Sequence, residues 1–202
     1  MKKVLFVGLL LAAFSSFCLA APTRIGPTGL IMAPSADSLR GGSFNLALHH
    51  YHETNQLSFV VGLADNLEAG LSAWKDKNHS DTSAFLKYTL VPETSRQVGL
   101  AIGGRVYKNS NSLFVVGSKF LSEIGARGHI GFVTTGDGLF FMGLSKTLPS
   151  QRSFPKTIAM ADFYNGSLNV GLRILLTNEV NLDLSLIDLD DAMITLGFHS
   201  HF

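Results

Sequence analysis

Residues 168–187 read LNVGLRILLTNEVNLDLSLI, and this stretch decides the fold. Every even-numbered position in it holds leucine, valine or isoleucine, except for Asn178. Most odd-numbered positions hold a polar residue, a charged residue or glycine. Because successive side chains of a β-strand point to opposite faces, this alternation predicts two strands, each with one apolar face. The polar pair Thr177-Asn178 is typical of the turn that joins them.

Similar runs, separated by short turn signals, fill the chain from residue 41 onward. Clear alternation recurs at 98–106 and 194–202, and weaker runs occupy 43–51, 56–63, 67–75, 82–91, 112–121, 127–135, 138–147 and 156–164. Turn pairs such as Asn165-Gly166 separate these runs. The sequence therefore predicts an all-β fold over residues 41–202. We expect a single antiparallel up-and-down β-barrel of about twelve strands, within a range of roughly eight to twelve.

The strand face opposite the leucines separates a membrane barrel from a soluble one. This second face carries small residues, such as Gly70, Gly103, Gly171 and Ser185, with isolated charges between them. Such a mixture suits a crowded barrel interior, and a nearly uncharged opposite face suits lipid. Charged residues make up 15% of the chain, against roughly 25% in an average soluble domain. We therefore expect a transmembrane barrel, with a secreted soluble β-protein of binding function as the alternative.

The N-terminus has the pattern of an export signal. Lys2 and Lys3 precede an apolar run over residues 4–14, and Cys18 and Ala20 are small residues suitably placed for cleavage after Ala20. Residues 1–20 are therefore predicted to be a cleaved signal peptide. The alternatives are an uncleaved membrane anchor and a lipid-modified cysteine at position 18.

The segment that follows, residues 21–40, breaks regular structure with Pro22, Pro27 and Pro34. We expect it to be irregular, apart from one helical turn over residues 36–39. It is predicted to lie in the periplasm or to enter the barrel.

The C-terminus carries a second localisation signal. The chain ends on Phe202, preceded by Gly197 and Thr195. This spacing resembles the terminal signal of bacterial outer-membrane barrels, although Ser200 stands where an apolar or aromatic residue is usual. The resemblance implies localisation in the outer membrane. It also implies two partners, the outer-membrane lipids and the barrel assembly machinery that reads the signal.

Five charged residues fall on the less apolar face of their strands and are predicted to face the lumen. They are Glu68, Lys87, Arg105, Arg173 and Asp183. One interpretation is a charged lumen that filters solutes. The other is a set of compensating ion pairs that fill a narrow barrel, because paired charges satisfy each other in either case.

No pattern in the sequence indicates an enzyme, a cofactor or a metal site. The histidines at 49–52 and at 199–201 would lie toward opposite ends of paired strands, too far apart to share an ion at roughly 3.3 Å per residue. His199 and Ser200 are adjacent on a strand, so they cannot pair as base and nucleophile. A membrane-embedded lipid hydrolase is therefore a weak third alternative. The net charge of +1 gives no reason to expect nucleic acid.

The stretch TGLIMAPSAD, residues 28–37, resembles the opening motif of YjbH-like proteins. The matching residues are Thr28, Gly29, Leu30, Ile31, Pro34 and Ala36. Two later pieces also fit, residues 66–72 and the pair Lys87-Tyr88. The resemblance implies an outer-membrane β-barrel and, in some members, a link to exopolysaccharide production or export. We therefore expect a small pore or envelope component, with polysaccharide or small solutes among its partners.

Overall fold

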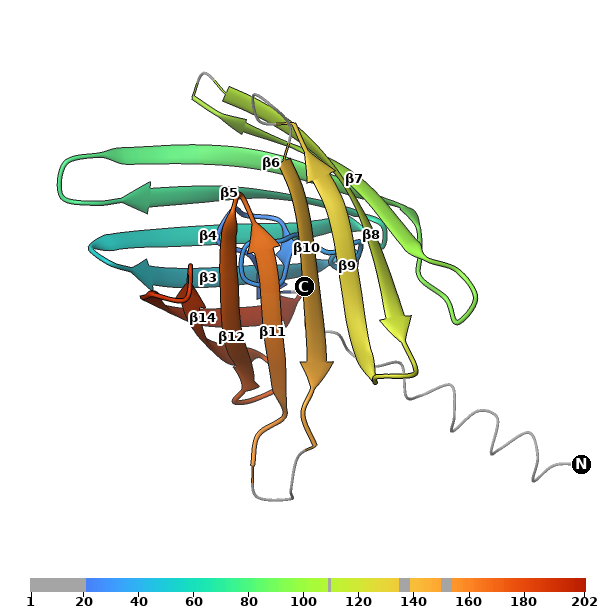
Figure 1. The fold of residues 1–202 in the computed structure, drawn as a ribbon. Coiled ribbons are helices and arrows are strands. Elements are labelled where there is room, and N and C mark those ends of the chain that lie inside the picture. The colour runs from blue at the N-terminus through green and yellow to red at the C-terminus, as the bar shows by residue number, and fades with distance from the viewer. Residues whose placement is uncertain (1–20, 109, 135–138, 150–153) are drawn as a thin grey trace, which may run out of the picture.

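The computed structural model describes residues 21–108, 110–134, 139–149 and 154–202, and twelve strands of it form one closed barrel (Figure 1). The strands are β3 (Ser43–Tyr51), β4 (Thr54–Ala64), β5 (Leu67–Lys75), β6 (Ser80–Val91), β7 (Gly99–Tyr107), β8 (Ser110–Leu121), β9 (Ala126–Val133), β10 (Leu139–Thr147), β11 (Thr157–Tyr164), β12 (Ser167–Leu175), β13 (Val180–Ile187) and β14 (Asp191–His201). The predicted signal peptide lies outside the described residues. No helix in the described ranges is long and apolar enough to cross a membrane.

Each barrel strand pairs antiparallel with its neighbours in sequence, and the last strand pairs with the first. β14 lies beside β3, with Met193 opposite Tyr51 at one end and His201 opposite Ser43 at the other. This seam closes the barrel, so its strands present no long unpaired edge. The predicted all-β antiparallel up-and-down barrel of about twelve strands is confirmed.

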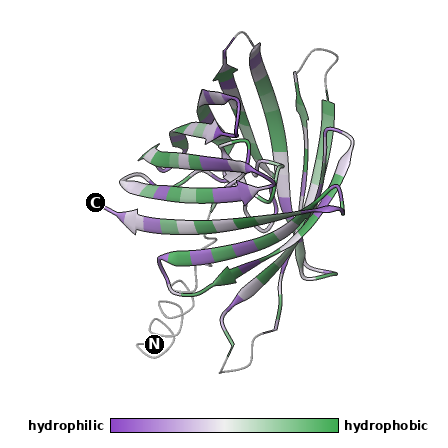
Figure 2. Ribbon diagram, turned by 90° about the vertical axis from the view of Figure 1, so that its left-hand side faces the viewer, coloured by the Kyte–Doolittle hydropathy of each residue, from purple (hydrophilic) through white to green (hydrophobic). Residues whose placement is uncertain are grey.

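The two faces of the barrel wall differ sharply in chemistry. On β12, Leu172 points outward and is 40% exposed, whereas Arg173 points inward and is 4% exposed. Their partners on β13 repeat the pattern, with Leu184 outside and Asp183 inside. Figure 2 shows the same alternation of apolar and polar residues along many strands. An apolar outer face around a polar interior is the reverse of a soluble barrel, so the soluble alternative is not favoured.

Several glycines of the second face lie under aromatic rings of the neighbouring strand. A Cβ atom on any of three such glycines would come within 2.4 Å of the ring of the residue directly opposite. The pairs are Gly70 with Phe85, Gly103 with Phe114, and Gly131 with Phe141. The glycines are therefore required by the close approach of the rings, which fill the lumen from the wall inward.

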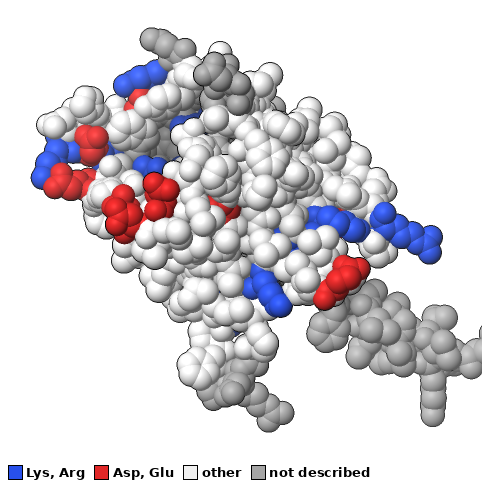
Figure 3. Space-filling view, viewed as in Figure 1, with Lys and Arg blue, Asp and Glu red and all other residues white. Residues whose placement is uncertain are grey.

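The two ends of the barrel differ in their connections. At the end opposite the chain termini, called the turn end, hairpins are short, as at 52–53 and 165–166. Asn165 and Gly166 have φ angles of 54° and 83°, both positive, as a two-residue type I′ turn requires. At the terminal end the connections include the longer loop 92–98. Most charged side chains visible in Figure 3 lie in two groups toward opposite ends, with a largely uncharged belt between them.

Residues 21–42, called here the plug segment, lie inside the barrel (Figure 1, blue). The short strands β1 (Ala21–Pro22) and β2 (Thr28–Gly29) pair to form a small hairpin at its start. Its buried apolar side chains pack against lumen-facing side chains of β8, β10, β11 and β14, among others. The helical turn expected over residues 36–39 is absent, and that expectation was wrong. The N–H groups of Ala36 and Leu39 instead donate to side chains of the wall.

Candidate functional site

The interior of the barrel is the candidate site, because its charged side chains converge on the plug segment. Glu68 on β5 and Lys87 on β6 are directly opposite each other and fully buried, with Nζ 3.0 Å from Oε1. Glu68 accepts hydrogen bonds from Thr28 N (2.9 Å) and Leu39 N (2.8 Å). Lys87 donates to the carbonyl oxygens of Thr28 (2.9 Å) and Ser35 (3.2 Å). The pair thus provides partners for both N–H and C=O groups of the plug backbone.

These additional hydrogen bonds explain how an ion pair persists with no exposure to water. Burying two charges is costly unless every remaining donor and acceptor is satisfied. Here the Thr28 side chain also donates to Glu68, with Oγ1 2.8 Å from Oε2, and it accepts from Lys87 at 2.6 Å. Thr28 belongs to the motif that resembles YjbH-like proteins, and the structure places it at the centre of the buried network.

A second ion pair holds the tip of the plug segment. Arg173 on β12 lies directly opposite Asp183 on β13 and contacts it through Nε at 2.9 Å and Nη2 at 2.8 Å. The same guanidinium donates to the carbonyl oxygens of Gly29 (3.1 Å) and Leu30 (3.2 Å). Asn181 donates to Asp183 at 2.7 Å. The planar guanidinium thus spans a carboxylate and two plug carbonyls at once.

Asp162 on β11 binds the turn of the plug segment from the other side. One of its oxygens, Oδ2, accepts three consecutive backbone N–H groups, from Ile31 (3.0 Å), Met32 (2.8 Å) and Ala33 (3.0 Å). The other oxygen accepts from Asn169 at 2.7 Å. Consecutive N–H groups that converge on one anion form a backbone nest. Sequence reasoning missed Asp162, although its place between outward Ala161 and Phe163 marks it as inward-facing.

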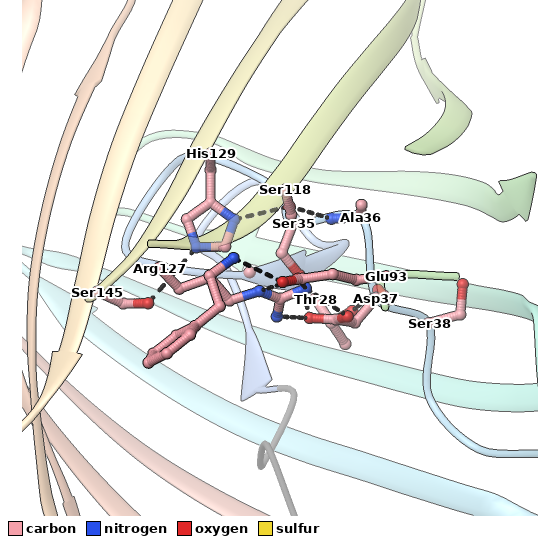
Figure 4. A network of polar contacts seen from close by, with 12 residues as sticks. Thr28, Ser35, Ala36, Asp37, Ser38, Glu93, Ser118, Arg127, His129 and Ser145 are labelled. Atoms are coloured by element: carbon pink, nitrogen blue, oxygen red, sulfur yellow. Dashed lines mark hydrogen bonds and ion pairs between the residues drawn. The ribbon is translucent and has the colours of Figure 1, made fainter. Parts of the chain in front are cut away.

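A third group of contacts closes the terminal end of the lumen (Figure 4). Arg127 on β9 forms ion pairs with Asp37 of the plug segment and with Glu93 of loop 92–98, the latter at 2.7 Å. Burial alone would raise the pKa of Asp37, but the hydrogen bond and charge of Arg127 outweigh burial and hold that pKa below its usual range. None of these three was among the site residues predicted from the sequence, although Asp37 ends the stretch 28–37.

Ser118 and His129 form a hydroxyl–imidazole pair that resembles part of a hydrolase site. Ser118 Oγ lies 2.8 Å from His129 Nδ1, and it accepts the N–H of Ala36 at 2.9 Å. The other ring nitrogen faces Ser145 at 3.5 Å rather than a carboxylate. Ser118 is buried beneath the plug segment. The pair therefore binds the plug segment and lacks the access that a nucleophile needs.

Arg105 differs from the other four charged residues predicted to face the lumen. It also lies on the inner face, but no carboxylate of the described residues is within ion-pair distance of it. Its guanidinium carbon lies 5.3 Å from the centroid of the Tyr107 ring. Its Nε atom is buried and has no hydrogen-bond acceptor among the described residues.

The predicted assembly residues lie on the closing seam and at the chain end. Phe202 is 83% exposed and stacks on Phe44, with ring centroids 5.5 Å apart. Thr195 faces the lumen and contacts His49 at 2.8 Å. A Cβ at Gly197 would lie 2.3 Å from Asn181 Oδ1 of the adjacent strand. The role of these residues in assembly stays a prediction.

Four histidines lie on the two strands of the same seam, His49 and His50 on β3 and His199 and His201 on β14. His199 contacts Asn45 at 2.5 Å and His201 contacts Ser43 at 2.8 Å, in each case the residue directly opposite. Within the described parts of the chain, no group of three or more His, Cys, Asp or Glu side chains is placed to hold a metal ion.

Comparison with solved structures identifies the type of fold. No protein-family model and no curated protein match the chain. Among solved structures, the barrel is similar to a KdgM porin, with a TM-score of 0.55 and 8% identity over 79% of this chain and 99% of the porin. It is also similar to a KdgM porin in complex with disordered oligogalacturonate, with a TM-score of 0.54, 7% identity and the same coverage. The chain has a porin-type fold. At this identity the similarity concerns the fold alone, and the YjbH-like resemblance stays a prediction.

Proposed function

We propose that this protein is an outer-membrane β-barrel of porin type whose lumen is closed by its own plug segment. In this proposal the barrel is a small channel that is shut at rest. A solute passes only when residues 21–42 move. The apolar outer face, the porin-type fold and the C-terminal Phe202 support a location in the outer membrane.

One observation carries this proposal: the lumen charges bind the plug backbone rather than lining an open path. Glu68, Lys87, Asp162 and Arg173, from four strands around the barrel, all donate to or accept from backbone atoms of the plug segment. Apolar packing alone would not fix the position of a segment in the lumen. Here buried polar groups of the segment have specific hydrogen-bond partners on the wall, so the segment has a defined position in the closed barrel.

Short oligosaccharides are the solute class that we propose to test first. Two independent similarities favour them. One KdgM porin with the same fold was solved with oligogalacturonate. The motif around Thr28 resembles a family with members linked to exopolysaccharide. The swelling rate of liposomes that contain the protein, measured in sugars of increasing length, tests this choice separately from conductance.

Conductance across planar bilayers tests the channel. The purified mature protein should conduct little, whereas a variant that lacks residues 23–40 should open. The double variant Glu68→Gln/Lys87→Met should open intermittently, because it removes the ion pair under Thr28. The matched control is Glu53→Gln/Lys77→Gln, which removes an exposed ion pair at the turn end and should behave as the wild type. Folding of each variant is checked by its heat-modifiable mobility in gels.

Two results would contradict the channel proposal. A wild-type protein that conducts as freely as the deletion variant would show that the plug segment does not close the lumen. Folded variants of both kinds that never conduct would show that the barrel is an envelope component without a pore.

A further inference from the structure

Two arginines in the lumen lack the partners that the other inward-facing cations have. Lys87, Arg127 and Arg173 each contact a carboxylate. Arg24 of the plug segment and Arg105 of β7 form no ion pair with a carboxylate anywhere in the described ranges. Two cations inside a barrel wall, without a counter-charge, form a region of positive potential that favours an anion.

The surroundings of these two arginines are aromatic. The guanidinium carbon of Arg24 lies 4.4 Å from the centroid of the Tyr51 ring, near the turn end of the barrel. Burial lowers the pKa of Arg24, Tyr51 partly opposes this, and the positive charge of Arg105 lowers it further. The positive charges of the two guanidinium groups thus act on each other. An aromatic face attracts a cation but is no carboxylate partner, so neither arginine is held in an ion pair.

A small cavity lies beside Arg105, between the plug segment and the wall. Its volume is about 40 Å³, and its polar lining comes from Arg105, Ser112 and Tyr164. Phe114 and Phe141 form apolar walls, and Pro27 of the plug segment forms part of another wall. A polar site needs roughly 10–15 Å³ to hold one water. The cavity therefore has room for a small polar group such as a carboxylate.

We propose that this cavity binds a small monovalent oxyanion of the carboxylate class, between Arg105 and the plug segment. The planar guanidinium of Arg105 would hold two oxygens in parallel, and its unpartnered Nε is the donor left for this purpose. The hydroxyls of Ser112 and Tyr164 are additional donors. The small volume of the cavity favours formate or acetate over larger ions.

This site goes beyond the proposed channel and has a consequence for the plug segment. Ile25, Pro27 and Pro34 form one side of the cavity. An anion bound there contacts the seated plug and the barrel together, so it stabilises the closed arrangement over one in which the plug segment has left.

Thermal unfolding of the mature protein in detergent tests the site without any measurement of conductance. Sodium formate replaces sodium chloride stepwise at constant ionic strength, and the midpoint Tm is recorded. The wild type should gain Tm with formate in a saturable way. Arg105→Gln should gain none. The matched control Arg96→Gln, which removes an exposed arginine on loop 92–98, should respond as the wild type. Benzoate, which is much larger than formate, should not reproduce the effect.

A second variant keeps the test informative if Arg105→Gln does not fold. Arg105→Lys retains the charge but cannot hold two oxygens in parallel, so its apparent affinity for formate should fall about tenfold. The proposal is overturned if formate leaves the wild-type Tm unchanged. It is overturned equally if the wild type and the Arg105 variants respond alike.

Discussion

Replacement of Asp162 by Asn should loosen the plug segment without opening the barrel. In the wild type one carboxylate oxygen accepts the N–H groups of Ile31, Met32 and Ala33. The amide of Asn retains an acceptor at this position but loses the negative charge. A hydrogen bond to a charged group contributes roughly 1.5–3 kcal/mol, against about 1 kcal/mol for a neutral one. Three bonds weakened by about 1 kcal/mol each give a loss of about 3 kcal/mol in the stability of the seated plug.

Hydrogen exchange followed by mass spectrometry measures this loss directly. A loss of about 3 kcal/mol in local stability should raise the exchange rate of the 31–33 amides by about a hundredfold, since each 1.4 kcal/mol corresponds to a factor of ten. Asp190→Asn, an exposed carboxylate in the turn between β13 and β14, is the matched control and should change nothing. Unchanged exchange at residues 31–33 would refute the reasoning. An equal rise in β10, β11 and β12 would also refute it, because Asp162 would then support the wall rather than the plug.

Three further predictions follow from the wall, the chain end and the terminal mouth. Leu172→Arg should lower the free energy of unfolding in lipid vesicles by roughly 2–4 kcal/mol if the site is near the bilayer midplane. Urea unfolding measures this loss against the control Leu172→Met, and a negligible loss would place this face away from lipid. Deletion of Phe202 should lower the amount of barrel recovered in outer membranes, and normal recovery would contradict its role as an assembly signal. The lowered pKa of Asp37 means that its ion pair with Arg127 is intact above the usual carboxyl pKa and is lost as pH falls through the lowered value. A spin label at Ser38→Cys should therefore become more mobile in acid, and Asp37→Asn should abolish this pH dependence.

The inner face of the wall also limits one class of substitution that the sequence makes look harmless. Gly171 faces the lumen between Val170 and Leu172, where small residues are common. A Cβ there would lie 2.6 Å from Ser185 Oγ and 2.9 Å from the Leu184 carbonyl oxygen. Even serine therefore requires the adjacent strand to shift, which alternation alone does not reveal.

The sequence alone determined the strands and the side of the wall on which each residue lies. Alternation with a period of two is a local property, so the run at 168–187 predicts its strands, its turn and its two faces without knowledge of the rest of the chain. Arg173 and Asp183 could therefore be assigned to the same face. Their pairing depends on the register between strands, which the short turn at 176–179 restrains but does not specify by itself.

Only the tertiary structure decided what the lumen contains. Residues 21–42 have no periodicity, and their conformation comes from side chains distant in sequence, such as Asp162, whose carboxylate binds Ile31 across 131 positions. Proline and glycine in this segment indicate irregular backbone, but not which wall charges satisfy its N–H and C=O groups. The same limit applies to Arg105. Its strand and face follow from alternation, whereas its lack of a carboxylate partner depends on every strand that surrounds it.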